Sequence, residues 1–217
     1  MKKYFSGKDP RAQGKTRVAR AQSAAEINNF VGSNFSTVAP GVPVCACAFG
    51  TARSEAKVAK ELFATTPVAT KASEAIGEAG ALHYLKQTLA AQGIKFDKKD
   101  LFVFNGANAF NMVYFDAAPP NATKAIVLEA KGGSSTLGSR LNYPRSAPVK
   151  QSTKAYANTI IQVMIDSPDD KRADVGLQLK KLQNGTPPKI LYAGVATKYD
   201  KSAKKVHNPV PIFATKL

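Results

Sequence analysis

The sequence has few of the side chains that usually build metal or redox centres: among its 217 residues are two cysteines, two histidines and no tryptophan. Cys45 and Cys47 are separated by one residue, so a disulfide between them would be strained and a zinc site would lack ligands. We expect both to pack as small apolar residues in a reducing compartment. His83 and His207 form no histidine cluster, and their spacing gives no support to an acid/base pair.

Long hydrophobic runs are also missing. The least polar stretch, residues 38–52, contains two prolines and two glycines and is shorter than the ~18 residues that a membrane span needs. The first 17 residues carry charge with no apolar run behind them, which is unlike a Sec signal peptide. We therefore expect no membrane partner, and export, if it occurs, by a route other than Sec.

Acidic residues are scarce, with 15 Asp and Glu against 31 Lys and Arg, and the formal net charge is +16. Such an excess favours a polyanionic partner, because basic side chains neutralise phosphates and release counterions. Nucleic acid, an anionic membrane surface and an acidic protein all remain open on composition alone. The hydrophobic fraction of 44% is sufficient for a folded core.

The order of the expected elements predicts the fold class. Apolar periodicity and breaker residues predict helices over 19–30, 54–64, 71–91, 152–165 and 169–182, and strands over 101–104, 112–115, 125–131, 189–198 and 211–216. Residues 132–149 read as a long loop and 198–205 as a solvated basic loop. This order predicts an α/β fold with a mixed central sheet flanked by helices. We expect a basic arm and N-terminal helical extension over 1–69, and a core over 70–217.

The pattern that bears on chemistry is Glu129-Ala-Lys131 at the end of the apolar strand 125–131. Side chains alternate along a strand, so these two point the same way. A carboxylate can hold Mg²⁺ or Mn²⁺, and a lysine beside it can stabilise charge on a phosphate. One carboxylate is too few for a metal site, and Asp116 and Glu78 are the candidate second acids. The plainer interpretation is a solvated ion pair.

The loop that follows supplies further candidates. Arg140 and Arg145 come directly after the Glu-x-Lys strand, and guanidinium groups match phosphate oxygens in a bidentate way. We expect both to contact a nucleic-acid backbone.

The segment EAKGGSSTLGSR, preceded by FNMVYFD, resembles the nuclease domains of bacterial polymorphic toxins, which belong to the PD-(D/E)xK or restriction-endonuclease-like superfamily. The resemblance covers roughly residues 70–165 and is most specific over 129–138. It implies a restriction-endonuclease-like core, in which Glu129 is a metal ligand and Lys131 the catalytic lysine. It also implies that Glu78 matches the acid often supplied by the core helix of that family.

The same resemblance extends to the helix after the motif. Gln151, Lys154 and Tyr156 are similar to a Gln-x-x-x-x-Tyr helix start in such toxins, which implies contact with a metal-bound water or a phosphate. One position departs from the family, because Asn111 stands where an acid is usual. Either Asp116 takes over, or Asn111 ligates through its carbonyl oxygen, or metal binding is weakened, or the residue is an inactivating substitution.

The resemblance implies a function as well: a Mg²⁺- or Mn²⁺-dependent endonuclease that acts as an antibacterial toxin on DNA or RNA in the cytoplasm of a target cell. Such a toxin is secreted or injected by a non-Sec route and is neutralised by a cognate immunity protein, which we expect to be acidic. Two alternatives stay open. One is a non-enzymatic basic nucleic-acid-binding protein, and the other is a protein whose charge serves an acidic protein partner.

Overall fold

The computed structural model describes residues 20, 22–30, 68–106, 108–133, 135–141, 147–200 and 205–217. It is an α/β protein built on a five-stranded mixed sheet, as the order of elements predicts. The expected arm at 1–17, the expected helix at 54–64, Cys45, Cys47 and Arg145 lie outside the described residues. The expected helix at 19–30 is confirmed over 22–30, where the described residues are helical.

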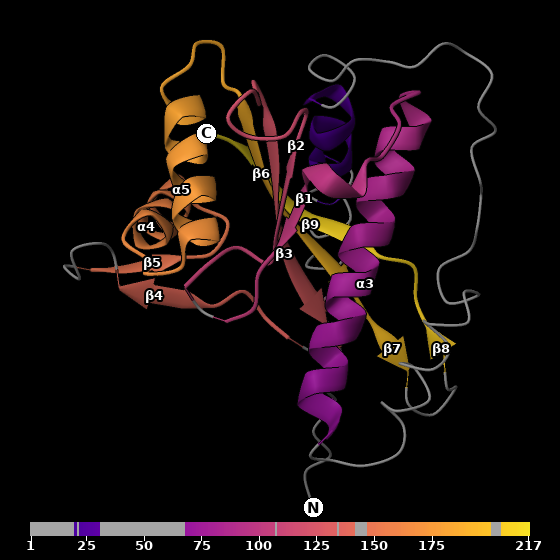
Figure 1. Ribbon diagram of the computed structural model, residues 1–217. Coiled ribbons are helices and arrows are strands. Elements are labelled where there is room, and N and C mark those ends of the chain that lie inside the picture. The colour runs from indigo at the N-terminus through magenta and orange to yellow at the C-terminus, as the bar shows by residue number, and fades with distance from the viewer. Residues whose placement is uncertain are drawn as a thin grey trace, which may run out of the picture.

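The central sheet has the strand order β1-β2-β3-β6-β9 (Figure 1). β2 (Met112–Phe115) pairs antiparallel with both β1 (Leu101–Val103) and β3 (Ala125–Gly132). β3 pairs in parallel with β6 (Ile190–Thr197), and β6 pairs antiparallel with β9 (Val210–Lys216). β3 is therefore the middle strand, and its continuous apolar run Ala125–Leu128 is buried on both faces.

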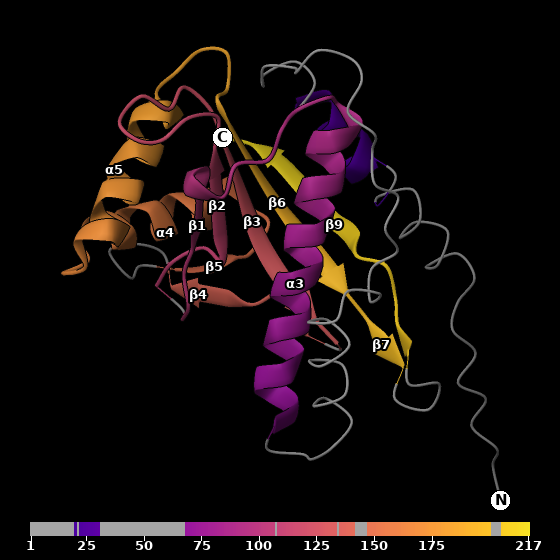
Figure 2. The same cartoon turned by 45° about the vertical axis from the view of Figure 1, so that its right-hand side comes forward.

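One face of the sheet is covered by α3 (Val68–Ala91), which crosses it diagonally (Figure 2). Its buried residues Ala81, Leu85 and Leu89 pack with the even-numbered β3 residues Ile126 and Leu128. The helix ends at Gly93 as the sequence predicts: its φ is 70°, and the N–H groups of Gly93 and Ile94 donate to Ala90 and Leu89. The helical residues 22–30 pack into this same layer, with Ile27 and Phe30 buried.

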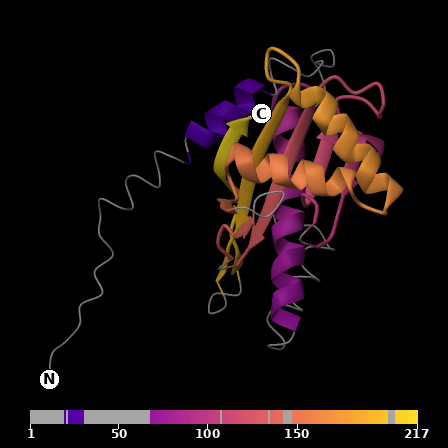
Figure 3. The same cartoon turned by 90° about the vertical axis from the view of Figure 1, so that its left-hand side faces the viewer.

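The other face is covered by α4 (Lys154–Ile165) and α5 (Asp170–Gln183), which Figure 3 shows in front of the sheet. This layer packs on the odd-numbered β3 residues Ala125 and Val127 and on Tyr192 of β6. Both helices begin at a side-chain cap, since Thr153 accepts from the Tyr156 N–H and Asp169 from the Arg172 N–H. Because β3 alternates strictly, Glu129 and Lys131 belong to the α4 face.

The connection expected as a loop over 132–149 contains two short strands. β4 (Ser139–Leu141) and β5 (Pro148–Lys150) pair antiparallel and lie beneath α4 and α5 in Figure 1. The loop prediction was wrong here because three-residue strands with mostly exposed side chains leave no hydrophobic alternation to detect. The basic segment at 198–205 likewise contains β7 (Tyr199–Asp200), which pairs with β8 (Lys205–Val206).

Two small features complete the described fold. A single turn of 3-10 helix, η1 (Lys98–Asp100), leads into β1 and is capped by Asp97. Within the described residues, no helix combines the length and the apolar character needed to cross a bilayer.

Candidate functional site

Glu129 is the buried centre of the polar cluster on the α4 face. Its side chain is 3% exposed, and Gln151 Nε2 donates to Glu129 Oε2 at 3.2 Å. The second oxygen, Oε1, is buried and has no hydrogen-bond partner. A buried carboxylate oxygen without a partner costs free energy, so this atom marks a position where a further ligand would be stabilising.

Burial raises the pKa of Glu129 to about 7, and Lys131 and then the Tyr192 hydroxyl lower it. Burial dominates because the charged form loses its hydration in the protein interior. The carboxyl group is therefore balanced between its two protonation states near neutral pH. Any cation that approaches it would favour the ionised form.

Lys131 lies two residues further along β3, on the same face, and is half-buried. Its charge lowers the pKa of Glu129, yet no salt bridge joins these two described residues. The solvated ion pair that the sequence left open is therefore not formed. The ammonium group is left available for another anion near the carboxylate.

Gln151 connects Glu129 to the β4–β5 hairpin. Its backbone N–H donates to the Gly138 carbonyl at 3.0 Å, and its Oε1 accepts from the Gly138 N–H at 2.8 Å. Its Nε2 donates both to Glu129 and, at 3.1 Å, to the Tyr156 hydroxyl. Both amide protons of the side chain are thus engaged. In this arrangement Gln151 holds the carboxylate in place.

The backbone before α4 is shaped to bring Gln151 and Tyr156 together. Ser152 has a φ of 86°, a conformation that non-glycine residues rarely adopt. Its carbonyl accepts from the Thr215 hydroxyl at 3.1 Å, which anchors this turn to β9. The Thr153 side chain then caps the helix by accepting from the Tyr156 N–H at 3.2 Å. The helix begins two residues later than the sequence predicts because Ser152 turns the chain away from helical geometry.

Asn111 lies beside the motif, immediately before β2. Met112 is paired with Leu128 on the antiparallel strand β3, so Asn111 lies opposite Glu129. The Asn111 Oδ1 accepts a hydrogen bond from the Ala130 N–H at 3.0 Å. Asn111 therefore lies opposite Glu129, at the start of the neighbouring strand, with one lone pair of its amide oxygen already used.

Basic residues surround the same cluster. Arg140, on β4, is one of the groups that lower the pKa of Tyr156, against the larger effect of burial. Lys154 is exposed at the first position of α4. Lys131 thus acts on Glu129, Arg140 acts on Tyr156, and Lys154 lies two residues before Tyr156 on the same helix.

Two of the expected ligands are not brought to Glu129. Asp116 lies at the other end of β2, about 16 Å along the strand from Asn111, and accepts hydrogen bonds from the Thr123 and Lys124 N–H groups. Glu78 lies on α3, across the sheet, where burial and then Glu74 raise its pKa. Among the described residues, no three His, Cys, Asp or Glu side chains converge on one point.

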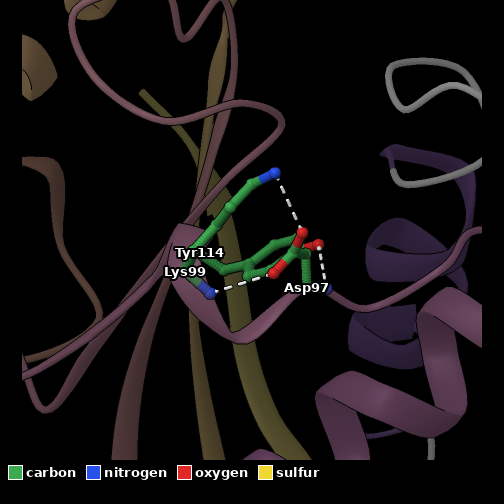
Figure 4. Close-up of polar contacts among 3 residues, drawn as sticks. All are labelled: Asp97, Lys99 and Tyr114. Atoms are coloured by element: carbon green, nitrogen blue, oxygen red, sulfur yellow. Dashed lines mark hydrogen bonds and ion pairs between the residues drawn. The ribbon is translucent and has the colours of Figure 1, made fainter.

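Near the end of β2 that holds Asp116 there is a separate polar cluster on the α3 side of the sheet (Figure 4). The Tyr114 hydroxyl accepts from the Asp97 N–H at 3.4 Å, and Asp97 forms a salt bridge of 3.0 Å with Lys99. The Tyr114 ring is stacked on Phe96. This cluster holds η1 against the sheet and has no part in the site around Glu129.

Sequence reasoning missed Tyr192, which is fully buried on β6 beside the carboxylate. Burial and then Glu129 raise the pKa of the Tyr192 hydroxyl, whose oxygen has no regular hydrogen-bond partner. A signal was present, since a tyrosine within a buried apolar strand needs a polar neighbour for its hydroxyl. Nothing in the sequence identified which neighbour it would be.

The donor set around Glu129 fits a divalent cation of the Mg²⁺ class, although sparsely. Such ions are commonly held by one or two carboxylates, with water and substrate phosphate supplying the other oxygens. Glu129 offers an unpartnered oxygen, and Asn111 offers the remaining lone pair of its amide. No protein-family model, curated protein or solved structure shows a significant match to this chain.

Proposed function

We propose that the chain is a divalent-metal-dependent endonuclease with a restriction-endonuclease-like core, in which Glu129 and Lys131 carry the chemistry. The observation that supports this most directly is the buried Glu129 carboxylate, which has one unpartnered oxygen and Lys131 beside it without a salt bridge. The mixed sheet and the net charge of +16 fit this proposal.

The proposed reaction is hydrolysis of a phosphodiester in DNA or RNA. A water adds to phosphorus, one P–O bond breaks, and the leaving oxygen takes up a proton. Glu129 and Asn111 would hold Mg²⁺ or Mn²⁺, which when bound would polarise the phosphate and lower the pKa of a coordinated water. Lys131 would stabilise the extra negative charge on the phosphate oxygens.

The surrounding residues would bind and orient. Arg140 and Lys154 flank the cluster and would contact backbone phosphates, as Arg145 would from outside the described residues. Gln151 would keep the Glu129 carboxylate in one orientation through the two hydrogen bonds of its amide nitrogen. Tyr156 completes that arrangement from the first turn of α4.

The biological part of the proposal rests on the resemblance of the motif to toxin nucleases. We propose that the protein acts against competing bacteria, reaches the cytoplasm of the target cell by a non-Sec route, and is neutralised by an acidic immunity protein. The charge of +16 fits such a partner, since complementary charge accelerates association.

A second candidate function is supported by a specific observation. Asp116 lies at the other end of β2, Glu78 lies on the helix that covers the opposite face of the sheet, and the Asn111 oxygen is partly used by Ala130. A basic nucleic-acid-binding protein without cleavage activity is consistent with that weak ligand set.

A cleavage assay separates the two functions. The protein is incubated with plasmid DNA, total RNA and tRNA, with Mg²⁺, with Mn²⁺ or with chelator. We expect metal-dependent cleavage that Lys131→Ala reduces by at least about 100-fold. Lys180→Ala removes the same charge from an exposed position on α5 and serves as the matched control. Salt-sensitive binding without cleavage of any substrate would favour the second function.

A further inference from the structure

Two buried oxygen atoms without hydrogen-bond partners meet on the α4 face of the sheet. They are Oε1 of Glu129 and the hydroxyl oxygen of Tyr192. The side chains are 3% and 0% exposed, so neither atom is hydrated from the surface. The Tyr192 hydroxyl lowers the pKa of Glu129, and Glu129 raises the pKa of Tyr192, so the two groups lie close together although they form no regular hydrogen bond.

The position of the Tyr192 hydroxyl is fixed by ring packing. The ring lies edge-on to Phe213 with centroids 4.9 Å apart, contacts Phe110 at 5.6 Å, and is nearly parallel to Tyr156 at 6.4 Å. Aromatic contacts on several sides leave little freedom besides rotation of the O–H bond.

The strand register places Tyr192 close to Glu129 on the same face of the sheet. Glu129 is paired with Gly194 on β6, and Tyr192 lies two residues before that glycine on the same face. Gly194 has no side chain, and the Phe213 ring occupies the place that a Cβ would take there. Tyr192 is therefore the β6 residue that reaches Glu129.

We propose that Tyr192 is a positioning residue for Glu129: its hydroxyl donates to Oε1 while Gln151 donates to Oε2, so the ionised carboxylate is held at both oxygens. The remaining lone pairs of the carboxylate then face the side of Lys131, where the cation and the phosphate would bind. This role rests on the proposed function, in which Glu129 is the metal ligand. A hydroxyl that serves only packing would contribute the same with or without a carboxylate beside it.

The first test compares thermal unfolding with and without Mn²⁺. Tyr192→Phe keeps the ring and removes the hydroxyl. At an Mn²⁺ concentration about 100 times the wild-type Kd, we expect the rise in Tm that Mn²⁺ produces to fall by about half, since a loosely held carboxylate binds the cation about tenfold more weakly. Tyr114→Phe deletes the same atom from another buried tyrosine, on the α3 face (Figure 4), and should leave the Mn²⁺ effect unchanged.

The second test needs no metal and tests the contact between Tyr192 and Glu129 directly. At pH 8, Tyr192→Phe should lower Tm by about 3 °C in the wild-type background and by less than about 1 °C in the Glu129→Met background. Equal losses in both backgrounds, or an undiminished Mn²⁺ effect, would overturn the positioning role. If the wild type shows no Mn²⁺ effect, the metal-dependent function fails. The Tm losses of Tyr192→Phe in the two backgrounds then still support or overturn the contact between Tyr192 and Glu129.

Discussion

Asn111 accepts a hydrogen bond from the backbone N–H of Ala130 at 3.0 Å, and this bond ties the residue before β2 to the centre of the Glu-Ala-Lys motif. An aspartate at the same position can accept the same bond with one oxygen and keep the other for a cation. Asn111→Asp would therefore add a second carboxylate opposite Glu129 without changing this backbone bond.

The first prediction is that Asn111→Asp strengthens metal-dependent cleavage. A second carboxylate beside Glu129 should raise the affinity for Mn²⁺ by at least about tenfold, since ligand charge dominates the binding of hard cations. The rate at limiting Mn²⁺ should rise with it. The measurement is cleavage against Mn²⁺ concentration for both proteins.

The same change should lower the stability of the metal-free protein, because two adjacent carboxylates repel each other. Asn208→Asp adds the same charge at an exposed position and should alter neither property. An Asn111→Asp protein that cleaves no faster than wild type, at any Mn²⁺ concentration, would falsify the role of Asn111 as a ligand.

The second prediction concerns pH and the metal-free protein. Burial raises the pKa of Glu129 from its ordinary 4.5 to about 7. Between pH 4.5 and about 7, Glu129 is therefore protonated in the folded state and ionised in the unfolded state. The free energy of unfolding contributed by this group falls as pH rises through that window, by up to about 3 kcal/mol.

Glu129→Gln removes this titration. We expect the variant and the wild type to be similarly stable near pH 4.5, and the variant to be more stable at pH 8 by up to about 3 kcal/mol. Denaturant unfolding at the two pH values measures the difference. Glu74→Gln, at an exposed position on α3, is the control. A pH-independent difference between Glu129→Gln and wild type would contradict the buried position of this carboxylate.

The third prediction concerns the turn that precedes α4. Ser152 adopts a φ of 86°, which glycine reaches without steric cost and β-branched residues do not. Stability should follow the order Gly, Ser, Val at this position, with Ser152→Gly gaining up to about 1 kcal/mol and Ser152→Val losing at least about 1 kcal/mol. Chemical denaturation of the three proteins gives the order, and a most stable valine variant would show that this backbone conformation does not form.

The fourth prediction concerns the contact between α3 and the end of the motif strand. A Cβ added at Gly77 would lie 2.7 Å from the Gly132 nitrogen, so backbone would have to move. We expect Gly77→Ala to destabilise the protein by about 2 kcal/mol or more and to reduce cleavage, because β3 shifts next to Lys131. Glu74→Ala changes an exposed residue on the same helix and should do neither. Full stability of Gly77→Ala would mean that α3 does not lie this close to β3.

The sequence predicted those parts of the fold that have a strong local signal. The run Ala125–Leu128 is apolar and bounded by turns, and Gly93 ends a long amphipathic stretch, so both elements were confirmed at nearly the expected bounds. The hairpin β4–β5 was missed because its strands are stabilised by pairing with each other and carry mostly exposed side chains.

The candidate site was predictable only where its residues are neighbours in sequence. The shared face of Glu129 and Lys131 follows from strand alternation alone. The choice between Asn111 and Asp116 depended on strand register, because they lie at opposite ends of β2 and only Asn111 lies at the Glu129 end. The position of Glu78 depended on which face of the sheet α3 covers. Tyr192 required knowledge of which strand lies beside β3, and periodicity carries no such information.

The parallel pairing of β3 with β6 also governs when such a site can exist. The β4–β5 hairpin and both helices of the α4 face lie between these strands in the sequence, so we expect the strand pairing to be among the slower contacts to form. Until it closes, Glu129 has neither Tyr192 beside it nor a dry environment. Under the proposed function, we therefore expect cleavage activity to appear only after this pairing has formed.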